Sequence, residues 1–168
     1  MPTTAKKTAA TTATNPTVGD AAPACKLPAT DGGEVSLASF KGKKNVVLYF
    51  YPKDDTPGCT VEAKDFRDLK KQFDKVDTVV IGLSKCDMKS HEKFAKKFDL
   101  NFPLASDAEG DVCESYGVWV EKSMYGKTYM GIQRATFLIN KKGVIAHAWP
   151  KVSVPEHAAE VLKTAKTL

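Results

Sequence analysis

Residues that could carry out covalent chemistry are concentrated in one stretch of the sequence, YPKDDTPGCTVEAKDFR over 51–67. Its Cys59 follows Pro57 and Gly58 at the start of a predicted helix, where backbone N–H groups lack partners and the helix dipole favours an anion. The thiolate form of cysteine is such an anion, and it is also the nucleophilic form. The position therefore predicts a reactive Cys59, whereas a lone cysteine elsewhere is more often an inert apolar side chain.

Three further residues could assist a Cys59 thiolate in attacking an electrophile. Thr56 carries a hydroxyl that could donate to the sulfur and then to an atom of the substrate. Pro52 could cover the nucleophile without presenting an N–H that needs a partner. Arg134, which directly precedes a predicted strand, could hold the thiolate and stabilise charge in the transition state. The plainer alternatives make Thr56 a helix cap or turn residue and Arg134 a surface charge.

The elements that must position these residues follow an α/β pattern, with short β-branched runs alternating with helical stretches around a largely parallel sheet. We expect strands over 46–51, 78–84, 135–140 and 144–149, the last two forming an antiparallel hairpin. We expect helices after Pro57 and over 89–98, 109–116 and 155–166. Residues 22–41 indicate an N-terminal β-hairpin with its turn at 31–33. The Cys59 loop then follows the first parallel strand, at the sheet edge where ligands bind.

Composition limits the classes of function. With 168 residues, of which 42% are hydrophobic, the chain can bury one core, and we expect a disordered tail over 1–18 and one domain over 19–168. The net charge of +5 comes from scattered lysines, with only two arginines, which does not indicate nucleic-acid binding. The apolar runs are too short to cross a membrane. Because the tail lacks the apolar region of a secretory signal, we expect a cytoplasmic protein, although its Ala, Thr and Lys content leaves a transit peptide open.

The remaining cysteines and the histidines do not indicate a metal or a disulfide framework. The four cysteines, at 25, 59, 86 and 113, form no C-x-x-C pair, and we expect Cys25 to be an inert core residue. The histidines at 91, 147 and 157 have neither mutual spacing nor cysteine neighbours typical of zinc sites. We therefore expect no metal and no cofactor.

The pattern P-x-x-x-T-x-x-C, met by Pro52, Thr56 and Cys59 with Arg134 ahead of a late strand, closely resembles the peroxiredoxin active site. More narrowly, FYPKDDTPGCTVEAKDFRD is similar to the peroxiredoxin Q, or bacterioferritin comigratory protein, subfamily. The resemblance continues through SHEKFAKKF, FPLASDAEG and RATFLIN, and so covers nearly the whole chain after the tail. It implies a thioredoxin-like fold, with a central mixed sheet flanked by helices.

The resemblance also implies an activity and the roles of several residues. It implies that Cys59 reduces hydrogen peroxide and organic hydroperoxides through a sulfenic acid, which thioredoxin or another thiol then reduces. Pro52, Thr56 and Arg134 would surround the sulfur, and Glu62 would support their hydrogen bonds. The alternative for Glu62 is that it merely favours the helix N-terminus. Subfamily members are often monomers, and we expect the same here.

The sequence departs from this subfamily at the second, resolving cysteine. Many members place it five residues after the first, where this chain has Lys64, and others place it at a position that aligns with Ala95. Cys86 is a candidate because it follows the second parallel strand and so ends at the same sheet edge as Cys59 if the two strands are neighbours. Cys113 is a weaker candidate. A one-cysteine cycle, in which an external thiol reduces the sulfenic acid directly, stays open.

Three alternatives belong to other functional classes. A thioredoxin-fold disulfide oxidoreductase would need a C-x-x-C where this chain has TPGC. A chaperone or binding module would use the lysine-rich surface and the tail without catalysis. A metal site built from Cys86 and His91 would lack further ligands.

Overall fold

The computed structural model describes residues 16–30 and 33–168. The disordered tail predicted over 1–18 therefore lies outside the described residues, apart from its last three. Of these, Thr17 belongs to a turn in which its amide donates to the Asp20 carboxylate at 2.9 Å. From Lys26 onward the chain forms regular elements.

The strands are β2 (Lys26–Ala29), β3 (Gly33–Ser36), β4 (Asn45–Phe50), β5 (Thr78–Ser84), β6 (Leu104–Ser106), β7 (Trp119–Met124), β8 (Lys127–Ile132), β9 (Ala135–Ile139) and β10 (Ile145–Trp149). The helices are the 3₁₀ helix η1 (Leu37–Phe40), α1 (Pro57–Asp74), α2 (Met88–Lys97), α3 (Val112–Ser115) and α4 (His157–Ala165). The four strands and the helices expected from the sequence are present, although α3 is shorter than expected.

One seven-stranded sheet, in the order β10-β9-β4-β5-β6-β2-β3, forms the centre of the molecule. β5 pairs parallel to β4 and to β6, whereas the pairs of β9 with β4 and β10, and of β2 with β3 and β6, are antiparallel. The mixed sheet is thus confirmed, as are both hairpins, but the expectation of a largely parallel sheet was wrong beyond β4, β5 and β6. The turn of the first hairpin includes residues 31 and 32, which lie outside the described residues.

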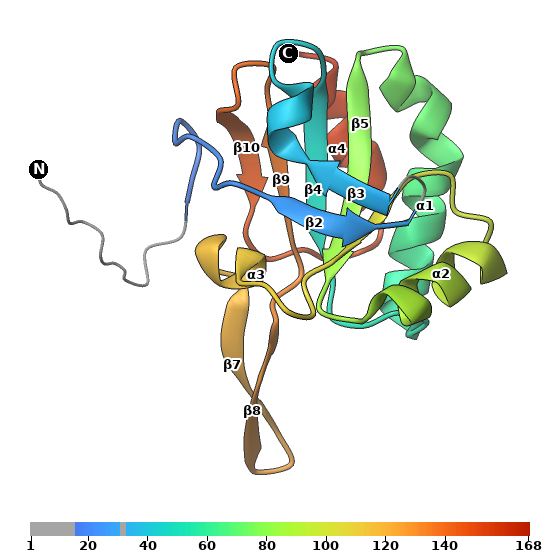
Figure 1. The fold of residues 1–168 in the computed structure, drawn as a ribbon, viewed down its shortest axis with the longest axis vertical. Coiled ribbons are helices and arrows are strands. Elements are labelled where there is room, and N and C mark those ends of the chain that lie inside the picture. Colours follow the sequence, from blue (N-terminus) through green and yellow to red (C-terminus); the bar gives the residue numbers. More distant parts are fainter. Residues whose placement is uncertain (1–15, 31–32) are drawn as a thin grey trace, which may run out of the picture.

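Strand β4 divides the hydrophobic core into two layers. All six of its residues are buried, so it shows a continuous apolar run rather than an alternating one. Because successive side chains of a strand point to opposite faces, Val46, Leu48 and Phe50 join one core cluster. Val47 and Tyr49 join the other cluster, together with residues of α1 and α4. Figure 1 shows α4 behind the sheet and α1 at the right of β5; the two helices contact each other, and α1 carries Cys59 into this second layer.

The hairpin of β7 and β8 was not expected from the sequence. It forms a separate two-stranded sheet that projects from the body of the molecule (Figure 1). Its two-residue turn, Tyr125 and Gly126, has φ values of 53° and 78°. Positive φ at both turn residues matches the twist of a tight hairpin. In the part of the chain that the structure describes, no helix combines the length and the apolar character that a membrane crossing requires.

Candidate active site

The loop that leaves β4 delivers Cys59 to the first turn of α1. Thr56, in extended conformation, is the N-cap residue, and Pro57 occupies the first turn, where its missing N–H leaves no bond unmade. The Cys59 side chain is buried, with 1% of its surface exposed. Gly58 permits a close neighbour, because a Cβ added there would lie 3.1 Å from Arg134 Nη2. The helix start, with Pro57 and Gly58 ahead of Cys59, is as the sequence predicted.

Arg134 reaches this helix start because of the sheet register. β9 runs antiparallel to β4 with Ala135 opposite Phe50, so the residue before β9 lies where β4 ends. Arg134 Nη2 donates to Cys59 Sγ at 3.4 Å, and Nη1 donates to Glu62 Oε1 at 2.6 Å. The structure therefore brings together Cys59, Glu62 and Arg134, three residues that the sequence singled out.

The Glu62–Arg134 pair is strongly coupled and mostly buried. Glu62 is 1% exposed, and burial raises its pKa to about 7 even though Arg134 favours the charged form. Burial opposes the charge of Arg134 too, but Glu62 and Cys59 hold its pKa above the ordinary value. Glu62 Oε2 has no hydrogen-bond partner among the residues that the structure describes, and neither has the buried hydroxyl of Tyr49. A cation in contact with the Cys59 sulfur is thus held in place by a carboxyl group behind it.

Thr56 and Pro52 lie in the same loop, which leads from β4 to α1. The Thr56 hydroxyl donates its proton to the Lys53 carbonyl at 2.8 Å. A hydrogen bond from Thr56 to Cys59 or to a peroxide oxygen would require that proton to turn away from Lys53. Pro52 is exposed and lines a cavity, and its predicted role as a cover of Cys59 stays a prediction.

That cavity, of about 410 Å³, lies between the active-site loop and the β7–β8 hairpin. Its lining residues include Pro52, Cys86, Trp119 and Lys122. Burial lowers the pKa of Lys122, the charge of Arg134 lowers it further, and Cys59 opposes both effects. Lys122 therefore interacts electrostatically with Arg134 and Cys59. The sequence analysis missed this residue, and the only local signal was Gly126 between two stretches of strand-forming residues.

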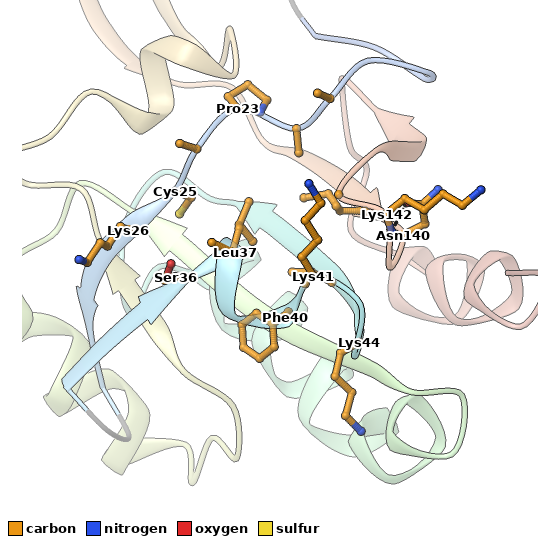
Figure 2. A pocket seen from close by; sticks show the side chains of 17 residues that line it. Pro23, Cys25, Lys26, Ser36, Leu37, Phe40, Lys41, Lys44, Asn140 and Lys142 are labelled. Carbon is orange, nitrogen blue, oxygen red and sulfur yellow. Dashed lines mark hydrogen bonds between the residues drawn. The ribbon is translucent and has the colours of Figure 1, made fainter.

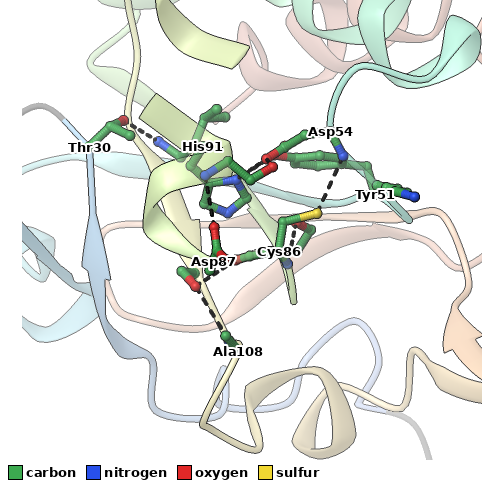
Figure 3. Close-up of polar contacts among 12 residues, drawn as sticks. Thr30, Tyr51, Asp54, Cys86, Asp87, His91 and Ala108 are labelled. Carbon is green, nitrogen blue, oxygen red and sulfur yellow. Dashed lines mark hydrogen bonds and ion pairs between the residues drawn. The ribbon is translucent and has the colours of Figure 1, made fainter. Parts of the chain in front are cut away.

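Cys86 lies at the same sheet edge, as the sequence predicted on the condition that β4 and β5 are neighbours, which they are. Its side chain is half-buried, and Sγ accepts a hydrogen bond from the Asp54 backbone N–H at 3.4 Å (Figure 3). Since Asp54 belongs to the loop that also carries Pro52 and Thr56, Cys86 is tied to the active-site loop. Neither Lys64 nor Ala95 supplies a thiol.

The sequence analysis also missed a buried polar network around the Asp54 side chain. Its carboxylate accepts from the Tyr51 hydroxyl at 2.5 Å and the Ser90 hydroxyl at 2.8 Å, and it lies 2.7 Å from His91 Nδ1. His91 Nε2 is 2.9 Å from the Ala105 carbonyl, so both ring nitrogens are occupied (Figure 3). Although burial opposes ionisation, hydrogen bonds from His91 and Tyr51 hold the pKa of Asp54 below its usual range. The network fixes the loop between β4 and α1.

The two remaining cysteines lie in unreactive surroundings. Burial raises the pKa of Cys25 to about 12, and burial together with the charge of Asp107 raises the pKa of Cys113 further still. Thiols of this kind stay protonated at neutral pH and are poor nucleophiles. This agrees with the inert role expected for Cys25.

Comparisons with known proteins agree on one family. The model of the AhpC/TSA family matches residues 18–148. The peroxiredoxin bcp of Coxiella burnetii is 54% identical over 86% of this chain and 95% of its own length, and peroxiredoxin Bcp of Bacillus subtilis is 47% identical over 90% and 96%. A solved structure of the bacterioferritin comigratory protein of Xanthomonas campestris, from work on its alkyl peroxide reduction, has a TM-score of 0.80 at 41% identity and covers 85% of this chain and 90% of that chain.

Proposed function

The chain belongs to the AhpC/TSA family, and we propose that Cys59 is the thiol with which this peroxiredoxin reduces hydroperoxides. The protein is a thiol-dependent peroxidase, so its substrates are a hydroperoxide and a reducing thiol. The observation that carries the assignment to Cys59 is its contact with Arg134, which is anchored in turn by Glu62. A guanidinium beside the sulfur stabilises the thiolate and the charge that develops as the O–O bond breaks.

The first half of the proposed cycle is a displacement at oxygen. The Cys59 thiolate attacks the terminal oxygen of ROOH, an S–O bond forms, and the O–O bond breaks. The leaving alkoxide takes up a proton and departs as ROH, and the sulfur remains as a sulfenic acid. Arg134 and the Thr56 hydroxyl, once released from Lys53, would donate to the peroxide oxygens during this step. Pro52 and the 410 Å³ cavity would form the approach for the substrate.

For the second half we propose that Cys86 acts as the resolving thiol. It would attack the sulfur of the Cys59 sulfenic acid, releasing water and forming a disulfide, which thioredoxin or another dithiol then reduces. Cys86 is the half-buried cysteine of the four, the others being buried. The hydrogen bond from the Asp54 N–H to its Sγ supports the proposal, because Asp54 belongs to the active-site loop. The competing proposal is a one-cysteine cycle, in which the external thiol attacks Cys59 itself.

The role of Cys59 is tested by stopped-flow kinetics with hydrogen peroxide and an organic hydroperoxide. Cys59→Ser should lose at least about a thousandfold in rate, because the nucleophile is removed. Cys113→Ser is the matched control and should keep the wild-type rate, since that thiol is buried on the other side of the sheet. Near wild-type turnover by Cys59→Ser would overturn the proposal.

The role of Cys86 is tested by non-reducing mass spectrometry after one equivalent of peroxide. The wild type and Cys113→Ser should show a Cys59–Cys86 disulfide, whereas Cys86→Ser should retain a Cys59 sulfenic acid. A wild type without that linkage, whose sulfenic acid is consumed by added thiol, would establish the one-cysteine cycle instead.

We also propose that the enzyme is a cytoplasmic monomer that uses no metal or other cofactor and binds neither nucleic acid nor membranes. The scattered lysines support the absence of a nucleic-acid site. Sedimentation equilibrium of the full chain should give the mass of one chain, and fluorescence microscopy of a C-terminally tagged chain should show uniform cytoplasmic signal. A dimer mass would contradict the proposed monomer, and an organelle pattern would contradict the proposed cytoplasmic location.

A further inference from the structure

A second cavity, of about 440 Å³, lies at the end of the sheet opposite to the active site (Figure 2). It borders Val46, at the start of β4, whereas the Cys59 loop leaves the other end of that strand. Three segments enclose it: residues 21–26, the region of η1, and the turn between β9 and β10. Its volume lies within the range of small-molecule sites. Nothing in the peroxidase cycle uses this cavity.

The walls of this cavity are apolar and already formed. The apolar lining residues are Ala21, Ala22, Pro23, Ala24, Cys25, Leu37, Ala38, Phe40, Val46 and Ile139. Backbone hydrogen bonds join the three segments to one another: Leu37 N–H to the Cys25 carbonyl at 3.0 Å, Ala22 N–H to the Gly143 carbonyl at 2.9 Å, and Gly42 N–H to the Lys141 carbonyl at 2.7 Å. A ligand would therefore enter without first having to order its site, which lowers the cost of binding.

The charged groups around the cavity are all cationic. Lys26, Lys41, Lys44 and Lys142 line it, and no aspartate or glutamate among the described residues does. Lys44 lies 3.7 Å from Asp77 and is partly neutralised. Lys41 and Lys142 have no ion-pair partner within the described ranges 16–30 and 33–168. The rim therefore carries positive charge that an anionic group could balance.

These two lysines lie at one end of the cavity. The Lys41 side chain runs past the turn, since a Cβ added at Gly143 would lie 3.6 Å from Lys41 Cε. Asn140 lies beside Lys142 in Figure 2, and its Oδ1 accepts from the Lys142 N–H at 2.9 Å and the Val144 N–H at 3.1 Å, which holds the turn in place. Lys44, by contrast, points away from this end in Figure 2. Lys26 lies on the far side of the cavity from Lys142 in Figure 2, so Lys41 and Lys142 are the lysines beside the turn between β9 and β10.

We propose that this cavity binds an organic carboxylate with an apolar chain or ring. The carboxylate would lie between Lys41 and Lys142, and the apolar part would lie against Leu37 and Phe40. Each charge-assisted hydrogen bond to the carboxylate would fix its orientation, and burial of the apolar part would supply much of the affinity. The N-terminal tail is a poor occupant by charge, because residues 1–15 contain Lys6 and Lys7 and no acidic residue.

The test is a titration of the ¹⁵N-labelled full chain with decanoate, below its micelle concentration, followed by NMR. Decan-1-ol, which has the same chain without the charge, is the matched ligand. Decanoate should shift the amide signals of Phe40 and Gly143, and decan-1-ol should bind about tenfold more weakly, the worth of one charge-assisted hydrogen bond. The Cys59→Ser variant should bind decanoate like the wild type, so the site is independent of the proposed peroxidase cycle.

Variants complete the test. Lys41→Gln with Lys142→Gln should weaken decanoate binding at least about tenfold, whereas Lys89→Gln with Lys93→Gln, on exposed positions of α2, should leave it unchanged. The proposal is overturned if the signals of Phe40 and Gly143 do not move, or if decan-1-ol binds as well as decanoate. It is equally overturned if both lysine pairs act alike, or if sedimentation shows that decanoate merely drives two copies together.

Discussion

Two buried cysteines, Cys59 and Cys113, occupy similar positions with opposite electrostatic surroundings. Both lie near the start of a helix, and their exposed fractions are 1% and 0%. Arg134 donates to the sulfur of Cys59, whereas the Asp107 carboxylate accepts from the backbone N–H of Cys113 at 2.8 Å. Burial raises the pKa of the Cys113 thiol, and the charge of Asp107 raises it further. A helix start alone therefore does not make a nucleophile. What differs is the group beside the thiol, a guanidinium at Cys59 and a carboxylate at Cys113.

The second difference between the two regions lies in what the charged partner does for the fold. Asp107 accepts from the N–H groups of Val112 and Cys113, so it substitutes for the missing hydrogen bonds at the start of α3. Arg134 makes no such bond to α1 and instead contacts the sulfur and Glu62. We therefore expect changes at Asp107 to alter stability and changes at Arg134 to alter activity.

The largest expected effect is on activity. Arg134→Gln removes the cation beside the Cys59 sulfur and should lower the second-order rate with peroxide by about 10² to 10³. Arg134→Lys keeps the charge but cannot contact the sulfur and Glu62 through two separate nitrogens. Its rate should therefore lie between those of the wild type and Arg134→Gln. Stopped-flow fluorescence measures both rates. An Arg134→Gln enzyme with the wild-type rate would contradict the role of Arg134 that distinguishes Cys59 from Cys113.

Asp107→Asn should have the next largest effect, on stability. One carboxylate oxygen becomes an NH₂ group facing a backbone N–H, which should cost about 1–3 kcal/mol in the free energy of unfolding. The peroxidase rate should stay at the wild-type value. Urea unfolding followed by circular dichroism measures the change, with the conservative exposed substitution Asp111→Asn as control. A loss of rate without a loss of stability would show that the two regions are not separate.

Two glycines allow the same contrast by steric means. A Cβ at Gly58 would approach Arg134 Nη2, and a Cβ at Gly110 would approach the Asp107 carboxylate. Gly58→Ala should therefore shift the guanidinium and lower the peroxide rate about tenfold, equivalent to about 1.4 kcal/mol in the barrier. Gly110→Ala should lower stability and leave the rate unchanged. If the two variants exchanged phenotypes, the division of roles between Arg134 and Asp107 would be wrong.

The smallest expected effect is a pH dependence of stability from Glu62. Its pKa is about 7 in the folded protein against 4.5 as its ordinary value, so between these pH values the folded state binds more protons than the unfolded state. The contribution is therefore fully present below about pH 4.5 and is lost as the pH rises through 7, by about 1 kcal/mol between about pH 6 and 7. Urea unfolding across this range should show a flatter profile for Glu62→Gln. Parallel profiles would contradict the raised pKa.

Much of the fold and of the Cys59 site was predictable because the sequence patterns that indicate them are local. Thr56, Pro57 and Gly58 are residue types typical of a helix start, and they predicted the one before Cys59. The β-branched runs predicted four strands. Arg134 was found as a cation next to a strand, and the antiparallel register of β9 on β4 then brought it to the sulfur.

The missed features depend on contacts between distant segments. The partners of Asp54 include Ser90 and His91 on α2, and no periodicity in the sequence predicts contacts between these two segments. The β7–β8 hairpin alternates polar and apolar residues only weakly, because most of its residues are exposed and no core face imposes a pattern. Likewise, the hydrogen bond from the Thr56 hydroxyl to the Lys53 carbonyl depends on the conformation of the loop, which no residue pattern predicts.

The central claim is that Cys59, and not another cysteine, is oxidised by peroxide. The most direct measurement is treatment of the full chain with one equivalent of hydrogen peroxide in the presence of dimedone, which traps sulfenic acids, followed by peptide mass mapping. We predict a dimedone adduct on Cys59 in both the wild type and Cys86→Ser, with a higher yield in the variant, and no adduct on Cys25 or Cys113. An adduct confined to Cys86, with Cys59 unmodified, would contradict the account.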